Sequence, residues 1–350
     1  MGSILLFGFG CRETQNSSKP QEDLKSDTSH TIVTSLDSAG RLLSDFKPED
    51  MEYDSSEIEL YPAHLYHLDK ETQFGFVPLS DRYNFFNEEG SSVIDEEFLQ
   101  TEDKKQNYHR IEGKYRSLLL ERLAIEESDK IFIYHFFSDT LFSRKVSETP
   151  IVAFINPYGT SSEEILPYDF MFGFELDEAA SKIVNYRGTL AMVEQKNSFV
   201  QGKIAPIEWK AMDPKDFPEV VISSEWDKKR IARSNSTNCY QFEMNGLKYM
   251  VQNWGSNQNL GSRHVVVRSI KTKKIVYSKF YHDSEGTFLE PLNGIEESYY
   301  PDHPAQWAGK LFKNKPPVVF GFLSHSFGCR SIHFLGESEE FVQLRCDNRH

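Results

Sequence analysis

The segment 324–328 carries the residue types closest to a catalytic motif in this chain. It reads Ser-His-Ser-Phe-Gly, close to the Gly-x-Ser-x-Gly turn that exposes a nucleophilic serine. In that chemistry Ser326 would attack a carbonyl carbon, with a histidine as general base. However, Ser324 replaces the first glycine, a strand pattern follows where a helix is needed, and few residues remain for an acid and a histidine. We therefore expect a strand end with polar side chains in solvent, and no catalytic residue.

Two groups of acidic residues and histidines could supply ligands to a divalent metal ion. His282, Asp283 and Glu285 follow a predicted strand, and Asp302 and His303 lie in a second predicted loop. Carboxylate oxygens and imidazole nitrogens are common metal ligands, but no recognised spacing links these two groups. Since acidic loop residues are usually only solvated, we predict no metal ion and no other cofactor.

A polar segment around a tryptophan is a candidate for ligand binding. Asn253, Trp254 and Asn257 belong to the run Asn-Trp-Gly-Ser-Asn-Gln-Asn at 253–259. A flat indole ring beside amide side chains suits a sugar, which the ring can stack on and the amides can hydrogen-bond. The alternative is a loop whose tryptophan packs back into the core.

The cysteine nearest the N-terminus carries information about the compartment. Residues 4–10 form a short apolar run that ends at Cys11, and a polar segment follows. This stretch resembles the end of a bacterial lipoprotein signal peptide, and the matching positions are Leu5, Leu6, Gly8, Gly10 and Cys11. The resemblance implies lipidation of Cys11 and a place in the cell envelope, at the outer membrane or the cell surface. No Lys or Arg precedes the run, and a chance cysteine is the alternative.

Two further cysteines flank a predicted C-terminal hairpin. Apolar residues on both sides of a polar turn at 337–340 predict a pair of antiparallel strands. If the turn centres between Glu337 and Ser338, Cys329 and Cys346 are directly opposed and close enough for a disulfide bond. The alternative is two buried free thiols, and a shift of one residue in the register would remove the argument.

The charge of the chain restricts its partners. With 39 basic and 53 acidic residues, the formal net charge is −14. Phosphate backbones and anionic lipid surfaces both require basic surface, so we expect no nucleic-acid partner and contact with a membrane only through a lipid anchor. A glycan or protein ligand of the envelope is the partner that remains.

These observations lead to a functional hypothesis. We expect a lipid-anchored, extracytoplasmic bacterial protein with a non-catalytic binding or structural role. The alternative is an envelope hydrolase that acts on glycan or peptide. Glycoside hydrolysis needs two carboxylates at a defined separation, which a sequence cannot establish.

The composition changes along the chain and divides it into segments. After the lipoprotein-signal-like segment 1–11, residues 12–50 are polar with few aromatics, which predicts a disordered tether. A mixed α/β domain is predicted at 51–215 and a β-rich domain at 235–350. The predicted fold class is therefore α+β, with a mixed α/β N-terminal part followed by a mainly antiparallel β sandwich or partial barrel.

A few predicted helices and hairpins support this fold class. Apolar residues recur every three or four positions across 108–128, which predicts a helix, and a shorter helix is predicted at 176–187 before Gly188. In the C-terminal part, Asn245-Gly246 between alternating residues is a strong hairpin signal, because both central residues of a type I′ turn need positive φ. A second hairpin is predicted around 271–274.

Overall fold

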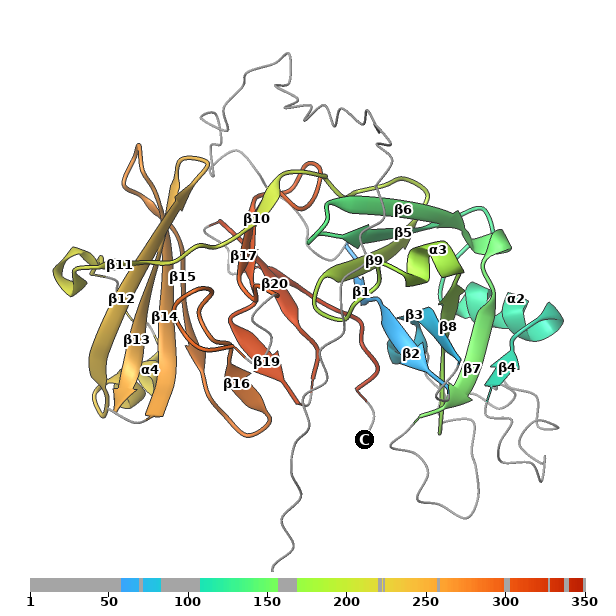
Figure 1. Ribbon diagram of the computed structural model, residues 1–350, viewed down its shortest axis with the longest axis horizontal. Coiled ribbons are helices and arrows are strands. Elements are labelled where there is room, and N and C mark those ends of the chain that lie inside the picture. Colours follow the sequence, from blue (N-terminus) through green and yellow to red (C-terminus); the bar gives the residue numbers. More distant parts are fainter. Residues whose placement is uncertain are drawn as a thin grey trace, which may run out of the picture. The chain divides into compact units, whose positions relative to one another are not determined.

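The computed structural model describes these parts of the chain: 58–68, 72–82, 108–156, 169–219, 222, 224–256, 259–298, 303–326, 328–336 and 340–348. Cys11, the signal-like segment 1–11 and the tether 12–50 lie outside the described residues. All paired strands within the described ranges are antiparallel. Figure 1 shows how these strands are arranged. The predicted α+β class with mainly antiparallel sheets is confirmed.

The N-terminal part contributes two sheets. The first has the order β2-β3-β8-β7-β4, and the second has the order β1-β9-β5-β6. The first is made of β2 (His64–His67), β3 (Gln73–Pro78), β4 (Tyr108–Arg110), β7 (Ile151–Ile155) and β8 (Phe170–Leu176). The second is made of β1 (Tyr61–Pro62), β5 (Lys130–His135), β6 (Thr140–Lys145) and β9 (Thr189–Glu194).

The rest of the chain forms two larger sheets and a short strand pair. The third sheet comprises β10 (Ile204–Pro206), β17 (Trp307–Gly309), β18 (Val318–Phe320), β20 (Ser331–Phe334) and β21 (Phe341–Gln343). The fourth comprises β11 (Lys210–Met212), β12 (Asn235–Met244), β13 (Leu247–Ser256), β14 (Asn259–Ser269) and β15 (Ile275–His282). The short pair is β16 (Thr287–Leu289) with β19 (Leu323–His325).

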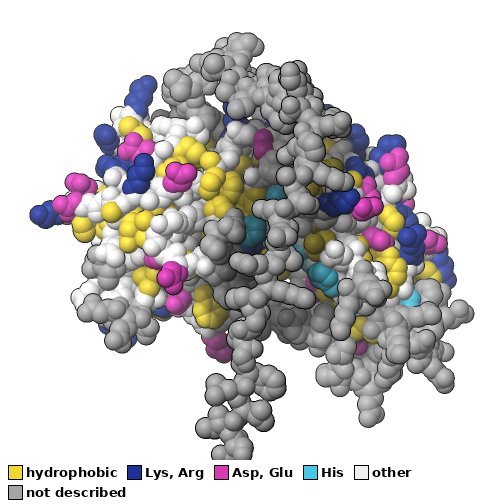
Figure 2. All heavy atoms as spheres, in the orientation of Figure 1, with side chains coloured by type: hydrophobic (Ala, Val, Ile, Leu, Met, Phe, Trp, Pro, Cys, Tyr) yellow, Lys and Arg dark blue, Asp and Glu magenta, His cyan; other side chains and the backbone are white. Residues whose placement is uncertain are grey.

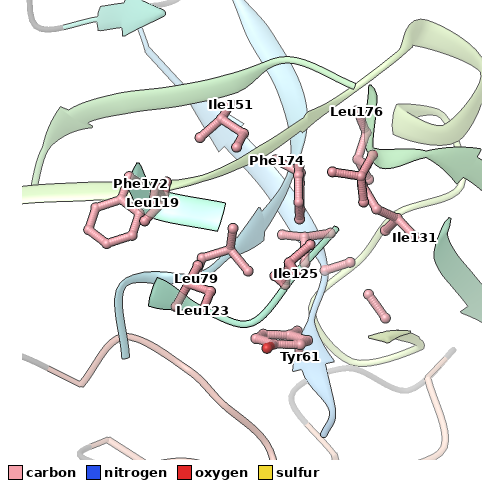
Figure 3. Packing of buried hydrophobic residues seen from close by; sticks show 14 of the residues in the cluster. Tyr61, Leu79, Leu119, Leu123, Ile125, Ile131, Ile151, Phe172, Phe174 and Leu176 are labelled. Carbon is pink, nitrogen blue, oxygen red and sulfur yellow. The ribbon is translucent and has the colours of Figure 1, made fainter. Parts of the chain in front are cut away.

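An apolar layer fills the space between the first and second sheets. Along β8, Phe170, Phe172 and Phe174 point into this layer, because successive side chains of a strand face opposite sides. Gly173 lies between them where β3 passes closely, and a Cβ there would sit 2.1 Å from the carbonyl oxygen of Val77. Figure 3 shows side chains gathered in this layer, among them Tyr61, Leu119, Ile131 and Ile151.

The third sheet is buried on both of its faces. Val318 and Phe320 of β18 pack against the second sheet, whereas Val319 packs against the fourth. A strand buried on both faces has no polar alternation, which explains the continuous run Val-Val-Phe. The third sheet therefore lies between the second and the fourth, as its orange and red strands do in Figure 1.

Both predicted helices are shorter than expected. Helix α2 spans Gly113–Arg122, because residues 108–110 pair with β7 as a strand. Helix α3 spans Glu178–Ser181, and Leu176, the predicted first residue, belongs to β8. Gly188 caps no helix. It lies close to the ring of Phe137, and an added Cβ would sit 2.9 Å from that ring.

The predicted hairpins of the C-terminal part are confirmed. Asn245 and Gly246 both have positive φ, 50° and 74°, and join β12 to β13 with Met244 opposite Leu247. Strands β14 and β15 form the second hairpin around 271–274. Since the third and fourth sheets pack face to face, this part has the predicted sandwich arrangement.

The predicted disulfide bond is present, but the register used to predict it is wrong by one residue. Cys329 and Cys346 are bonded, with their Cα atoms 5.7 Å apart. In the hairpin, Ile332 lies opposite Val342, which shifts the pairing by one position from the predicted register. Both cysteines lie beyond the ends of β20 and β21, so the strand pairing does not determine their positions.

The two predicted domains share contacts in the described structure. Strand β10 of the predicted 51–215 domain pairs with β17, and Leu60 forms a parallel bridge with Leu344. The division into 51–215 and 235–350 stays a prediction, since such contacts do not tell whether each part folds alone. In the described ranges, no helix has the length and apolar character needed to span a bilayer.

Candidate functional site

A cavity of about 230 Å³ lies near the ends of strands from the second, third and fourth sheets. Its apolar wall is formed by Phe136, Leu190, Tyr281, Phe320, Phe322 and Ile332. Its polar lining includes Arg187, Glu290, Ser324, His325, Arg330 and His333. An apolar cavity with a few convergent polar groups is the usual form of a small-molecule site.

The fold positions these side chains through strands that are distant in the sequence. Phe136 directly follows β5, and its ring packs 5.6 Å from the ring of Phe320 at the end of β18. Tyr281 comes from β15, where its hydroxyl lies 2.6 Å from that of Tyr277. The cavity therefore exists only when the second, third and fourth sheets are packed together.

Two arginines and a glutamate give the cavity its charge. Arg187 forms an ion pair with the largely buried Glu290, at 3.3 Å between Nη1 and Oε1. Arg330 donates to the carbonyl oxygens of Tyr186 and Arg187, and its guanidinium lies 4.7 Å from the centre of the Tyr186 ring. These bonds fix the orientation of Arg330 beside the cavity.

The histidines of the cavity are held in the neutral form. Burial and nearby Lys279 lower the pKa of His333 to about 3, and its Nε2 lies 3.1 Å from Ser331 Oγ. Burial, followed by the charge of Arg330, lowers the pKa of His325. A histidine with so low a pKa as His333 carries no proton at neutral pH and is a poor proton shuttle there.

Ser324 and His325 were expected at a strand end in solvent, but they lie on the separate short strand β19 beside the cavity. Both residues line the cavity, whereas Ser326 is exposed and donates its backbone N–H to the carbonyl oxygen of Gly286. The exposed position of Ser326 agrees with the expected strand end in solvent. Phe327 lies outside the described residues.

The predicted ligand-binding residues lie in and beyond β13. Asn253 is buried, where its Oδ1 accepts from Arg263 Nε at 3.0 Å and its Nδ2 donates to Glu296 at 3.2 Å. Trp254 is partly buried, and its Nε1 has no hydrogen-bond partner among the described residues. Asn257 lies outside the described residues. Ligand binding at these residues stays a prediction, but the amide of Asn253 already serves a buried network.

A serine, a histidine and an aspartate form a chain of hydrogen bonds that the sequence did not suggest. Ser262 Oγ lies 2.8 Å from His282 Nδ1, and His282 Nε2 lies 2.7 Å from Asp227 Oδ1. Ser262 and His282 are opposed on β14 and β15, and Asp227 belongs to helix α4 (Glu225–Ile231). Burial lowers the pKa of His282, while Asp227 opposes that shift.

These hydrogen bonds join the residue types of a nucleophilic triad, but the serine hydroxyl is not accessible to a substrate. Ser262 is only 1% exposed, so a substrate cannot reach its hydroxyl in this structure. The bonds instead join helix α4 to the outer face of the fourth sheet. His282 therefore has structural partners, and the nearby Asp283 accepts from the backbone of Leu289 at 2.7 Å. In the parts of the chain that are described, no three potential metal ligands gather.

The face drawn in Figure 2 carries charged side chains of both signs. Figure 2 shows acidic and basic side chains interspersed on both flanks of one face, with histidine side chains mostly nearer its middle.

Sequence reasoning missed Arg187, Glu290 and Arg330. They come from three separate connecting segments, and none belongs to a local motif. The position of Arg330, directly after Cys329, is a weak signal, because a disulfide fixes the backbone beside it. Comparison of the chain with family models, with curated proteins and with solved structures finds no match.

Proposed function

We propose that the chain is a lipid-anchored, extracytoplasmic bacterial protein that binds a small ligand without transforming it. The cavity of about 230 Å³ at the meeting of three sheets is the observation that carries this proposal. Its aromatic wall would bury an apolar body, and its few oriented polar groups would fix the position of that body. The low pKa of His333 also favours binding over acid–base chemistry at neutral pH.

The disulfide bond supports the proposed compartment. Disulfides persist in secreted, periplasmic and cell-surface proteins and are rare in reducing compartments. The Cys329–Cys346 bond closes a segment with a sequence separation of 17. Together with the lipoprotein-like residues before Cys11, it supports a place in the cell envelope.

The binding proposal is tested by two matched substitutions on neighbouring residues. Ser324→Phe fills the cavity, whereas Ser326→Phe adds the same ring at an exposed position two residues away. We expect native mass spectrometry of protein purified from its own host to show a bound small molecule in the wild type and in Ser326→Phe, but not in Ser324→Phe. Equal occupancy of both variants, or none in the wild type, would contradict binding in this cavity.

The anchor is tested independently of the cavity. We expect the mature chain from its native host to begin at Cys11 and to carry the added mass of a diacylglycerol group. Cys11→Ser should release the protein from the membrane fraction. An unmodified Cys11 in membrane-bound protein would overturn the lipid anchor and leave the cavity proposal untouched.

The alternative function, an envelope hydrolase acting on glycan or peptide, is favoured by the Ser262–His282–Asp227 hydrogen bonds. A fluorophosphonate probe labels activated serines, so it separates the two functions. Because Ser262 is buried, we expect no labelling. An adduct that is lost in Ser262→Ala would favour the hydrolase and contradict the non-catalytic role.

A further inference from the structure

Among the described residues that line the cavity, the formal charges do not cancel. Arg187 and Arg330 contribute two positive charges and Glu290 one negative charge, while the low pKa values keep His325 and His333 uncharged at neutral pH. The described residues of the lining therefore carry one net positive charge. This contrasts with the net charge of −14 for the whole chain, so the sign is a local property of the cavity.

Arg330 has donors left over for a ligand. A guanidinium carries five N–H groups. The bonds to the carbonyl oxygens of Tyr186 and Arg187 use one hydrogen on each terminal nitrogen, and the remaining N–H groups have no partner among the described residues. A planar guanidinium with free donors matches the two oxygens of a carboxylate, which makes this pairing strong and directional.

Burial makes the positive charge of Arg330 costly unless it is compensated. Arg330 is partly buried, and burial lowers its pKa, which the nearby charge of Glu290 offsets only in part. A positive charge removed from water is costly unless an anion or further hydrogen bonds compensate it. A bound anion would supply that compensation, whereas a neutral or cationic ligand would not.

The size and wall of the cavity limit the rest of the ligand. A cavity of about 230 Å³ restricts the ligand to a small molecule. The rings of Phe136, Phe320 and Phe322 line it, so an aromatic or aliphatic body is the matching shape.

We propose that this cavity binds a small organic monoanion, whose carboxylate faces Arg330 and Arg187 and whose apolar body packs against the phenylalanine rings. This inference rests on the proposed ligand-binding function of the same cavity and adds the chemical class of its ligand. The competing explanation is that both arginines only hold the surrounding backbone and glutamate in place.

Two probes of equal size separate these explanations on the wild-type protein. 3-Phenylpropionate and 3-phenylpropanamide have the same number of non-hydrogen atoms and differ in charge. By isothermal titration calorimetry at pH 7, we expect the carboxylate to bind about tenfold more tightly than the amide, because hydrogen bonds to a charged group are stronger than those to a neutral one. This comparison needs no variant and so does not depend on the folding of one.

Two variants provide a control, because they break the same ion pair and change the charge in opposite directions. Arg187→Gln removes the net positive charge of the lining, whereas Glu290→Gln raises it by one. We expect Arg187→Gln to weaken carboxylate binding about tenfold and Glu290→Gln to strengthen it severalfold, with little change for the amide. If the pair were only structural, both variants would shift affinity in the same direction for both probes.

The outcomes distinguish this inference from the function on which it rests. Equal affinity for the two probes, or effects of the same sign in both variants, would overturn the anionic ligand class. Absence of binding by both probes would overturn it too. The ligand-binding function is decided separately, by the native mass of Ser324→Phe against Ser326→Phe.

Discussion

At the scale of single residues, Arg330 joins the cavity to its surroundings. Its guanidinium holds two backbone carbonyl groups and stacks on the ring of Tyr186. Burial lowers its pKa, but the ordinary value for arginine is so high that the charge persists. The neighbouring histidines behave differently, because burial removes their charge at neutral pH. The permanent charge of the arginine and the neutral histidines together define what the cavity can bind.

The buried His333 should make the stability of the protein depend on pH. Burial lowers its pKa to about 3, below the value of about 6.5 in an unfolded chain, so the unfolded chain binds the proton more tightly. Stability is therefore highest above pH 6.5 and falls as the pH drops towards 3. At pH 5 this histidine alone should have lowered the free energy of unfolding by about 2 kcal/mol.

Urea unfolding at pH 7 and pH 5 measures this effect. We expect His333→Asn to lose less stability than the wild type between the two pH values, whatever its stability at pH 7. His67→Asn, at an exposed position of β2, is the matched control and should keep the wild-type dependence. An unchanged dependence in His333→Asn would show that this histidine titrates normally in the folded protein.

At the scale of elements, the sequence predicted best where local chemistry decides the structure. Asn245-Gly246 specifies its hairpin because the tight turn needs positive φ at both central positions, which Asn and Gly tolerate better than other residues. The helix predicted at 176–187 spans only Glu178–Ser181, and its predicted first residue, Leu176, belongs to β8 and to the apolar layer between the first and second sheets. Tertiary pairing overrode the helical pattern there. The disulfide was predicted correctly although the hairpin register was wrong by one residue. Cys329 and Cys346 lie outside the paired strands, so the strand register does not fix their positions.

The disulfide bond should stabilise the C-terminal hairpin. A closed loop of about 15 residues restricts the unfolded chain by about 3 kcal/mol, and the separation here is 17. We expect the double variant Cys329→Ser/Cys346→Ser to lose about 2–4 kcal/mol of unfolding free energy in urea. Reducing agent should reproduce this loss in the wild type and change nothing in the double variant. A double variant as stable as the oxidised wild type would show that the bond adds no stability.

At the scale of the whole molecule, the stacked sheets explain why the cavity escaped prediction. Its lining residues come from both predicted domains and meet only through the apolar layer between the second and third sheets. No local pattern encodes that meeting. The composition could indicate an antiparallel β-rich fold, but the order of the sheets depends on long-range packing such as that of β18.

The layer between the second and third sheets should couple the two parts of the chain. Phe312 is fully buried there, with its ring 5.9 Å from the ring of Phe199. We expect Phe312→Ala to cost about 3–5 kcal/mol and to lower the unfolding midpoints reported by both parts together. The exposed Phe341→Ala is the control and should change little. A shift confined to one part would show that the parts unfold independently.

The ligand in the cavity is the central claim, and a crystal structure of protein purified from its native envelope tests it most directly. We expect continuous density for a small organic molecule beside Arg330, with its apolar end among the rings of Phe136, Phe320 and Phe322. The account would be contradicted by a cavity that holds only ordered water. In that case the native mass of the same protein would equal the mass of the chain with its anchor.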